Sequence, residues 1–397
     1  MTSADGQPLR TFEIAEVEGQ YKPATVEIKN DTIILSNSTM TAPKYARYGW
    51  QPFTRANLVN SDQLPASTFR IEAEATEGGL EYGVSGAFAG TVNGRPYMAG
   101  GCNFPYADPI SVSPSAKCFY QGIYDLTTSE RVASLPRRVA YGASATTDQG
   151  LVMIGGEGCR QVWLFDGTTL TDLPELPATI DNAYAATSGS MVYVVGGNYA
   201  GEPSRRVLAL DLDKPESGWR QIATLPGSPR VQPVAVAADG KLYVWGGFTP
   251  RLGKSAPQVH TDGQCLDLKS GKWHSLPAPI NPNDGLPLTL SGGVAAAVGG
   301  EIIATGGVNH DIFLDAITDQ AADYLQHPVE WYRFNGQVCR FDTATETWSG
   351  GAHSNAEYAR AGAATAVVDD GETLLLVGGE LKPRVRTLRV IAVESGR

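Results

Sequence analysis

One acid and four bases are crowded into ten residues near the end of this 397-residue sequence. They follow the apolar run of LLLVGGELKPRVRT (374–387) and are Glu380, Lys382, Arg384, Arg386 and Arg389. A guanidinium group binds a carboxylate as a planar fork, and a carboxylate beside it can transfer protons. The stretch is therefore a candidate site for an anionic ligand, with a solvated turn held by salt bridges as the alternative.

The charge and the cysteines limit the classes of partner. The net charge is −11, which argues against a nucleic-acid partner because phosphates need a basic field. An anionic ligand must then be held by local bases working against the overall field. The five cysteines are scattered without metal spacing and the five histidines form no paired motif, so we expect no disulfide framework, no metal and no other cofactor.

The sequence shows neither a membrane span nor a signal peptide. No apolar run approaches the roughly 20 residues that cross a bilayer, so we expect no membrane partner. The N-terminal stretch MTSADGQPLRTFEIA has no basic region followed by an apolar one.

Six repeats predict the fold. An apolar strand ends in a glycine pair in PYMAGG, LVMIGG, VYVVGG, LYVWGG, IIATGG and LLLVGG. A run of small residues precedes each pair, and strands such as RRVLALDL and GWRQIATLP follow. The spacing scatters around the kelch period of about 50 residues. We therefore predict an all-β fold, a six-bladed kelch β-propeller whose small-residue strands face a crowded axis; a β-sandwich with coincidental glycines is the alternative.

The fifth repeat contains a long insertion. Phe313, Ala316, Ile317, Ala321 and Tyr324 recur at helical spacing in it. We expect a short helix there, either a partial lid over the channel mouth or a packing helix without ligand contact.

Three stretches carry a family resemblance. GVSGAFAG (83–90), GGVNHDIF (306–313) with the downstream WYRFN, and GGELKPRVRT (378–387) resemble the N-acetylneuraminate epimerases, kelch propellers that act as sialic acid mutarotases. The last two stretches precede the first in the commoner members, so the chain is similar to the cyclically permuted branch. The resemblance covers residues 79–397 and implies a propeller domain over residues 76–397.

Residues 1–75 form a separate small β segment in this interpretation. The residues of ATVEIKNDTIILS alternate with a period of two, which predicts a β-hairpin that turns at Asn30-Asp31. ARYGWQPFTRANLVNSDQLPASTFR (46–70) resembles the C-terminal end of the sialate O-acetylesterases. The chain is then the back part of an esterase–mutarotase fusion. The usual strand that closes the sixth blade is not evident in residues 70–82, and TFRIEAEAT is a candidate substitute.

The resemblance also implies roles for the charged stretch. Glu380 matches the family's catalytic acid–base residue and Arg386 its essential arginine, which is expected to bind the carboxylate of an acidic sugar. Lys382 is expected at the rim of the site. Arg384 stands where relatives usually carry glycine, so the resemblance does not fix the backbone path of this loop. Both are candidate substrate-binding residues, and the reaction needs no cofactor.

Three asparagines are further candidates. Asn103, Asn198 and Asn309 each follow a glycine pair closely and are expected either to contact sugar hydroxyls or to form turns. His310 and His327 flank the insertion and are expected either to assist proton transfer or to lie at the surface.

The function implied by the resemblance is interconversion of the α- and β-anomers of N-acetylneuraminate. The alternative is a non-catalytic kelch module that binds carbohydrate or protein through an exposed apolar patch. An active sialate esterase is disfavoured, because the catalytic Ser and His of those enzymes lie in earlier sequence. The resemblance favours a periplasmic or secreted location.

Overall fold

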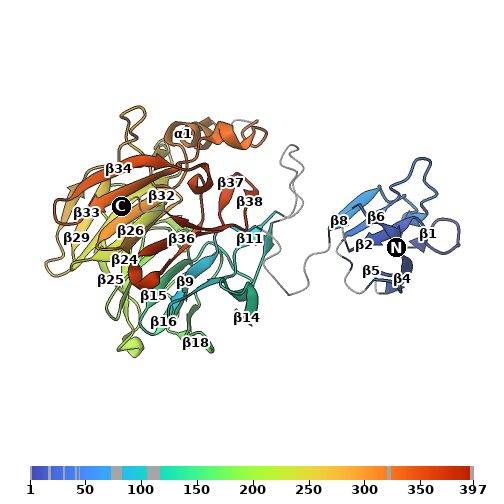
Figure 1. Cartoon of the computed structure of the whole chain (residues 1–397), viewed down its shortest axis with the longest axis horizontal. Coiled ribbons are helices and arrows are strands. Elements are labelled where there is room, and N and C mark those ends of the chain that lie inside the picture. Colours follow the sequence, from blue (N-terminus) through green and yellow to red (C-terminus); the bar gives the residue numbers. More distant parts are fainter. Residues whose placement is uncertain are drawn as a thin grey trace. The chain divides into compact units, whose positions relative to one another are not determined.

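The computed structural model describes residues 2–16, 19–29, 32–40, 43, 45–72, 83–104, 117–319 and 323–393. The chain divides into two compact units, Met1–Gly78 and Gly79–Arg397, each described by itself below (Figure 1). Strands dominate both, and α1 (His310–Asp319) is the α-helix among the described residues. The all-β prediction is thus confirmed. No helix in the described part of the chain is long and apolar enough to cross a membrane.

The first unit is built of short antiparallel strands around an aromatic core. One sheet has the order β3-β2-β6-β8. Its strands are β2 (Phe12–Ala15), β3 (Lys22–Pro23), β6 (Tyr45–Tyr48) and β8 (Phe69–Glu72). Two further pairs are β1 (Thr2–Ser3) with β7 (Leu58–Val59), and β4 (Thr25–Lys29) with β5 (Thr32–Ser36). Phe12, Tyr48 and Phe69 stack in the core.

Two predictions for this region have different outcomes. The hairpin is present as β4 and β5, while its turn at Asn30-Asp31 lies outside the described residues. The proposal that TFRIEAEAT closes the sixth blade is wrong for residues 69–72. These residues form β8, which pairs with β6 inside the first unit.

The second unit contains five antiparallel sheets with a four-stranded path and a final one with three strands, taken here in chain order. It also contains smaller sheets, among them β19 (Ile180–Asp181) with β22 (Asn198–Tyr199) and β23 (Glu202–Pro203). The first two sheets contain β9 (Phe88–Val92), β10 (Arg95–Ala99), β13 (Gly122–Asp125) and β14 (Glu130–Ser134), then β15 (Ala143–Thr147), β16 (Gly150–Ile154), β17 (Val162–Phe165) and β18 (Leu170–Leu173). The third contains β20 (Tyr184–Ser188), β21 (Met191–Val195), β24 (Arg206–Asp211) and β25 (Arg220–Thr224). The predicted strands RRVLALDL and GWRQIATLP are present as β24 and β25.

The remaining sheets continue this pattern. The fourth contains β26 (Val231–Ala238), β27 (Lys241–Thr249), β29 (Gly263–Asp267) and β30 (Trp273–Leu276), with β28 (Gln258–Val259) beside β27. The fifth contains β31 (Gly293–Val298), β32 (Glu301–Gly306), β33 (Gln337–Asp342) and β34 (Thr347–Ser354). The last contains β35 (Ala364–Val368), β36 (Thr373–Val377) and β39 (Val390–Val393). Its third strand therefore comes from the end of the described chain.

Six residues, each at or just before the start of the first strand of one of these six sheets, form a closed circle of backbone hydrogen bonds. Each donates its N–H to the carbonyl of the preceding member at 2.7–3.0 Å, and the first member donates to the last. They are Gly86, Tyr141, Asn182, Gln232, Gly292 and Gly362. We call this set the mouth ring. All six have φ between 52° and 69°, a left-handed conformation that costs L-residues roughly 1–2 kcal/mol each.

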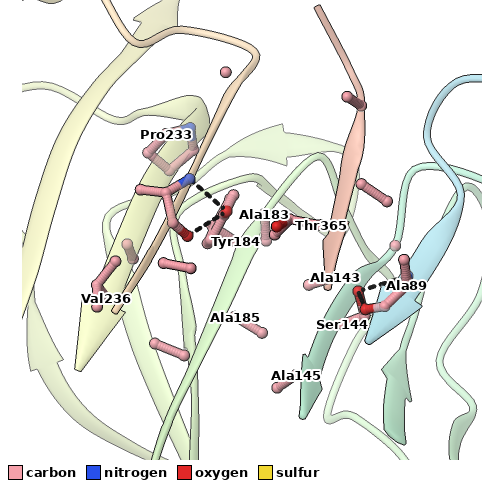
Figure 2. Close-up of a pocket in the computed structure, with 18 of the residues that line it drawn as sticks. Ala89, Ala143, Ser144, Ala145, Ala183, Tyr184, Ala185, Pro233, Val236 and Thr365 are labelled. Atoms are coloured by element: carbon pink, nitrogen blue, oxygen red, sulfur yellow. Dashed lines mark hydrogen bonds between the residues drawn. The ribbon is translucent and has the colours of Figure 1, made fainter. Parts of the chain in front are cut away.

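The mouth ring borders a narrow cavity between the first strands of the sheets. The cavity has a volume of about 280 Å³ and is lined mainly by Gly, Ala, Ser and Thr. Ala143, Ala145 and Ala185 face it from neighbouring strands (Figure 2). Tyr184 is one of the larger lining residues, and its hydroxyl exchanges two hydrogen bonds with the backbone of Ala295 on β31. The predicted small-residue strands thus line this cavity.

The last glycine pair joins the last sheet to the start of the second unit. The N–H of Gly379 donates to the carbonyl of Val84 at 2.7 Å. Gly378 and Gly379 have φ of 61° and 106°, and a Cβ on Gly378 would lie 2.6 Å from the same carbonyl oxygen. Glycine is thus required both by backbone conformation and by close approach of another segment.

Candidate active site

A two-stranded hairpin after the last glycine pair positions the charged stretch. β37 (Glu380–Lys382) pairs with β38 (Val385–Arg386), and the register sets Glu380 opposite Arg386 with a bulge between them. Arg384 turns the hairpin with φ of 70°, a conformation in which glycine is at ease. Arg384 is therefore an L-residue held in a conformation that glycine adopts without strain.

Arg386 is held by four acceptors. Nη1 donates to the carbonyl and to the Sγ of Cys102, both at 2.8 Å. Nη2 donates to the hydroxyl of Tyr141 at 3.0 Å and to Oε1 of Glu380 at 3.3 Å. β38 therefore lies beside β11 (Cys102–Asn103), as Figure 1 shows. These contacts leave the Arg386 side chain 3% exposed.

Glu380 is the more accessible member of the pair, with a side chain 22% exposed. Both hydrogen bonds that the described residues give to its carboxylate fall on Oε1, from Nη2 of Arg386 and from the backbone N–H of Arg384. Its backbone exchanges two hydrogen bonds with Ala361, which precedes Gly362 of the mouth ring. Among the described residues Oε2 therefore receives no hydrogen bond, and it is the carboxylate oxygen available to a ligand.

The electrostatics keep Arg386 charged and Tyr141 neutral. Burial is the largest single influence and lowers the pKa of Arg386, but Glu380, Tyr141 and Cys102 together raise it by more, so the net pKa is raised. Burial raises the pKa of Tyr141 well above its ordinary value despite the nearby arginine. The hydroxyl of Tyr141 accepts from Arg386 and still carries a proton that it can donate.

In this structure Arg386 cannot bind a ligand carboxylate in bidentate fashion, because protein acceptors occupy both Nη atoms. Its Nε is buried without a partner among the described residues. The guanidinium of Arg384 lies 5.5 Å from the ring centre of Phe104, and that of Arg386 lies 4.9 Å from the same ring. The two guanidinium groups thus lie near the same aromatic ring, and the buried one is paired with the partly exposed carboxylate of Glu380.

The expectation that Lys382 lies at the rim is wrong. Lys382 is 3% exposed, and its Nζ donates to the carbonyl of His327 at 2.7 Å. That bond ties β37 to the short 3₁₀ turn Val329–Tyr332 of the insertion. The physical reason is that the chain after α1 folds back over the hairpin, which a local pattern does not show.

This returning segment forms an aromatic cluster near the carboxylate. His327 stacks on Trp331 with ring centres 3.8 Å apart, so it is not a free surface residue. Burial is the main cause that raises the pKa of Tyr324 and of Tyr332, and the charge of Glu380 adds to both. The insertion therefore approaches the site through residues 324–332.

Helix α1 itself packs elsewhere. Phe313 meets Phe248 of β27 edge-on, with ring centres 5.2 Å apart. His310 bonds the carboxylate of its neighbour Asp311. These contacts fit the packing-helix interpretation better than the lid. Of the residues that suggested the helix, Ala321 lies outside the described part and Tyr324 lies beyond the end of α1.

The three candidate asparagines lie in different surroundings. Asn103 follows Cys102 and its Oδ1 accepts from the N–H of Phe104. The Nδ2 of Asn198 donates to Oδ1 of Asp181 at 2.7 Å. Asn309 caps α1 by accepting from the N–H of Ile312, and it borders a separate polar pocket. The hairpin thus brings Glu380, Arg384 and Arg386 together, while Asn309 is placed apart from them.

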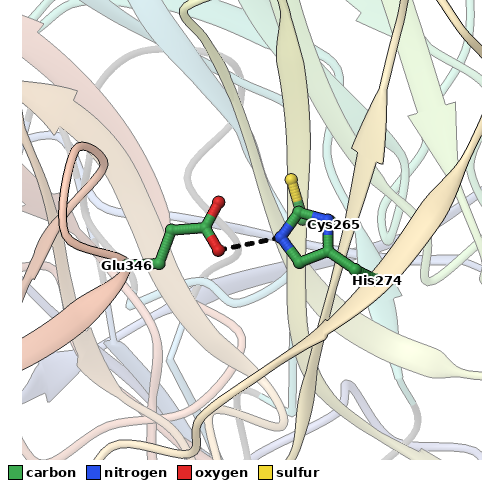
Figure 3. Close-up of side chains that lie close together, drawn as sticks. All are labelled: Cys265, His274 and Glu346. Carbon is green, nitrogen blue, oxygen red and sulfur yellow. Dashed lines mark hydrogen bonds and ion pairs between the residues drawn. The ribbon is translucent and has the colours of Figure 1, made fainter.

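A group of metal-ligand type lies on another part of the second unit. Cys265, His274 and Glu346 have side-chain atoms within 4.8 Å of one another (Figure 3). Glu346 accepts from Nε2 of His274 and from Nζ of Lys241, each at 2.8 Å. Burial raises the pKa of Cys265 to about 12, which keeps the thiol protonated. Because the Glu346 carboxylate already accepts from an ammonium and an imidazole, these side chains form an ion-pair network. All five cysteines lie within the described residues and are free thiols.

Cys102 and Tyr141 are the site residues that the sequence did not indicate. They contact Arg386 from 284 and 245 residues away. A signal was available for Tyr141: it occupies the position before the small-residue run at which three other repeats carry glycine.

The model of the N-acetylneuraminate epimerase family matches residues 173–397, more than half of the chain. An N-acetylneuraminate epimerase of Haemophilus influenzae (strain PittEE) is 32% identical over 228 residues, which cover 54% of this chain and 57% of that protein. One of Escherichia coli (strain K12) is 32% identical over 238 residues, which cover 56% and 60%.

The solved "Structure of YjhT" is also similar, with 28% identity and a TM-score of 0.46 over 57% of this chain and 69% of that one. The chain spans about 57–61% of the length of the curated relatives it matches.

Proposed function

The chain belongs to the N-acetylneuraminate epimerase family, and on that premise we propose that it is a sialic acid mutarotase. It would interconvert the α- and β-anomers of N-acetylneuraminate. The observation that carries the proposal is the pairing of Glu380 with Arg386 beside the mouth ring. A carboxylate with one free oxygen, paired with a buried guanidinium group, suits an acidic sugar whose anomeric hydroxyl must lose a proton.

We also propose that the second unit is a six-bladed kelch propeller. The circle of six backbone hydrogen bonds supports this arrangement, because it passes through all six sheets and returns to its start. The hydrogen bond from Gly379 to Val84 likewise links the last sheet to the segment that leads into the first sheet. In this arrangement the cavity of about 280 Å³ is the axial channel, and the hairpin of β37 and β38 stands at its mouth.

The proposed chemistry is proton transfer at one carbon. Oε2 of Glu380 takes the proton from the anomeric hydroxyl as the bond between that carbon and the ring oxygen breaks. The carboxylic acid so formed on Glu380 gives its proton to the ring oxygen, which restores the carboxylate, and the open-chain ketone recloses on either face by the reverse steps. Positioned acid–base groups typically contribute about 10²–10⁴ in rate, and every step is a proton transfer or the opening and closing of one C–O bond.

Arg386 and Arg384 have different proposed roles in this scheme. Arg386 lies beneath Glu380, fixes Oε1 and so turns Oε2 outward, and its charge attracts the substrate carboxylate. Arg384 presents a second positive charge from the turn. Lys382 is proposed to anchor the hairpin to the insertion, since its ammonium is committed to the carbonyl of His327.

The direct test follows α-N-acetylneuraminate, freshly released by a sialidase, by NMR with and without the protein. We expect the β-anomer to form faster at micromolar protein than in buffer alone. An unchanged rate in a protein that is folded by circular dichroism would refute the proposed activity.

The first unit is proposed to be the C-terminal part of a sialate O-acetylesterase-like region fused to the propeller. The support is the resemblance of residues 46–70 together with the separate compact unit they belong to. We place the functional division near residue 75, as the resemblance suggests.

A further inference from the structure

Three side chains project from the mouth ring, and all three stand on one arc of it. Tyr141, Asn182 and Gln232 are consecutive members, and the other three members are glycines. All three side chains line the axial cavity. Each is held at a φ of 52–62° that glycine would adopt without strain. Residues in such strained conformations are concentrated at ligand-binding sites, where the contacts of the side chain offset the conformational cost.

Hydrogen bonds join two of these side chains into a chain with a fixed direction. Nε2 of Gln232 donates to Oδ1 of Asn182 at 2.8 Å, and Nδ2 of Asn182 donates to Oδ1 of Asp181 at 2.7 Å. Asn198 donates to the same oxygen of Asp181. A carboxylate accepts and does not donate, so Asp181 orients both asparagine amides, and Asn182 in turn orients Gln232.

This direction leaves specific groups free at the Gln232 end. Its Oε1 can still accept, and the second hydrogen on Nε2 can still donate. A Cβ built on Gly292 would lie 3.2 Å from that Oε1, so glycine at the next ring position leaves space beside it. Neighbours in the ring lie about 5 Å apart, which makes it roughly 10 Å across, comparable to a nine-carbon sugar acid.

We propose that Gln232, held by Asn182 and Asp181, recognises the acetamido group of the substrate. A secondary amide has one donor and one acceptor, which match the free Oε1 and the free N–H of Gln232. At the other end of the arc, Tyr141 contacts Arg386, so the same arc links the acetamido contact to the charged pair. This inference rests on the proposed mutarotase function and assigns the residue that would determine its sugar specificity.

The test uses Gln232→Gly, because glycine suits a φ of 53° and keeps the backbone ring. We expect an unchanged or higher melting temperature, a KM for α-N-acetylneuraminate raised about tenfold or more, and a kcat within about threefold of the parent. For the substrate analogue with a hydroxyl in place of the acetamido group, the same substitution should change KM little. The difference in KM between the two sugars should therefore largely disappear. Asn93→Gly is the matched control, since Asn93 has φ of 51° in the exposed turn between β9 and β10.

The outcomes separate this inference from the proposed function. An active Gln232→Gly protein with unchanged KM and unchanged discrimination would overturn the role of Gln232 and leave the mutarotase standing. If the parent protein accelerates nothing, calorimetry with N-acetylneuraminate still tests the contact. Heat for the parent and at least tenfold weaker binding for Gln232→Gly would support it, and equal binding or no binding by both would refute it.

Discussion

The carboxylate of Glu380 and the guanidinium of Arg386 lie opposite each other on adjacent strands, with Nη2 3.3 Å from Oε1. The glutamate is partly exposed and the arginine is almost fully buried. The pair therefore has an inner cation that orients and an outer carboxylate that can react. This division of labour leads to different expectations for the two residues.

Replacing Glu380 by Gln should remove the proton-accepting oxygen and keep the shape of the side chain. We expect the accelerated rate to fall by about 10²–10⁴, down towards the rate in buffer. The NMR anomer assay measures this directly.

Glu357→Gln is the matched control for that variant. Glu357 pairs with Arg389 at the surface, with both side chains well exposed, and such pairs contribute about 0–1 kcal/mol. The Glu357→Gln protein should be as active as the parent protein. Full activity in Glu380→Gln would show that another group is the base.

Arg386→Lys should be far more damaging than Arg384→Gly. A lysine cannot serve the acceptors on Cys102, Tyr141 and Glu380 together, and a buried acceptor left without its donor costs about 1–3 kcal/mol. Arg384→Gly removes a charge and relaxes a left-handed residue. We expect Arg386→Lys to lose both stability and kcat, and Arg384→Gly to keep its melting temperature with KM raised less than about tenfold.

Thermal unfolding and steady-state kinetics on the two variants decide between these roles. If Arg384→Gly were the inactive variant and Arg386→Lys were normal, the inner and outer assignments would be reversed.

The repeats could be predicted from the sequence because they are local and periodic. Glycine pairs and alternating strands depend on neighbouring residues, and the structure has them where the pattern indicated. The position of Lys382 could not be predicted, since its partner is a backbone carbonyl 55 residues away in the folded insertion. A basic side chain in a turn-like stretch looks exposed until the segment above it is known.

The site was predictable only in part for the same reason. Glu380 and Arg386 follow from the motif, but what holds Arg386 arrives from other sheets. Comparing the six repeats position by position would have exposed the mouth ring, because Tyr141, Asn182 and Gln232 align with glycines. Their left-handed backbone is a property of the closed circle, which no single repeat contains.

The contact between Gly378 and Val84 predicts how strongly the last sheet is joined to the first. A Cβ on Gly378 would lie 2.6 Å from the Val84 carbonyl oxygen, whereas one on Gly189 would meet nothing within 4 Å, and the two residues have φ of 61° and 57°. Gly189→Ala should cost about 1 kcal/mol from backbone strain alone.

Gly378→Ala carries the same strain plus the backbone clash, so we expect a loss of about 3 kcal/mol or more. Urea unfolding of the two variants isolates the difference. Equal losses would mean that the first and last sheets can separate at this point without cost.

A buried histidine predicts an acid-sensitive window. Burial is the main cause that lowers the pKa of His260 to about 4, and Arg230 adds to it while Asp262 opposes it. The hydroxyl of Thr249 donates to the carbonyl of Pro229, so it accepts from Nε2 of His260 at 2.7 Å. The remaining Nδ1, 3.9 Å from Asp262, is the nitrogen that takes up the second proton.

The folded pKa of His260 lies below the unfolded value of about 6.5, so the unfolded state binds more protons between those two values. Stability should therefore fall as pH drops from about 6.5 to about 4, by roughly 3 kcal/mol in total from this residue. His260→Gln keeps a donor for Thr249 and cannot titrate. Urea unfolding at pH 7 and pH 4.5 should show a smaller drop for His260→Gln than for the parent, and an equal drop would place the acid sensitivity on other groups.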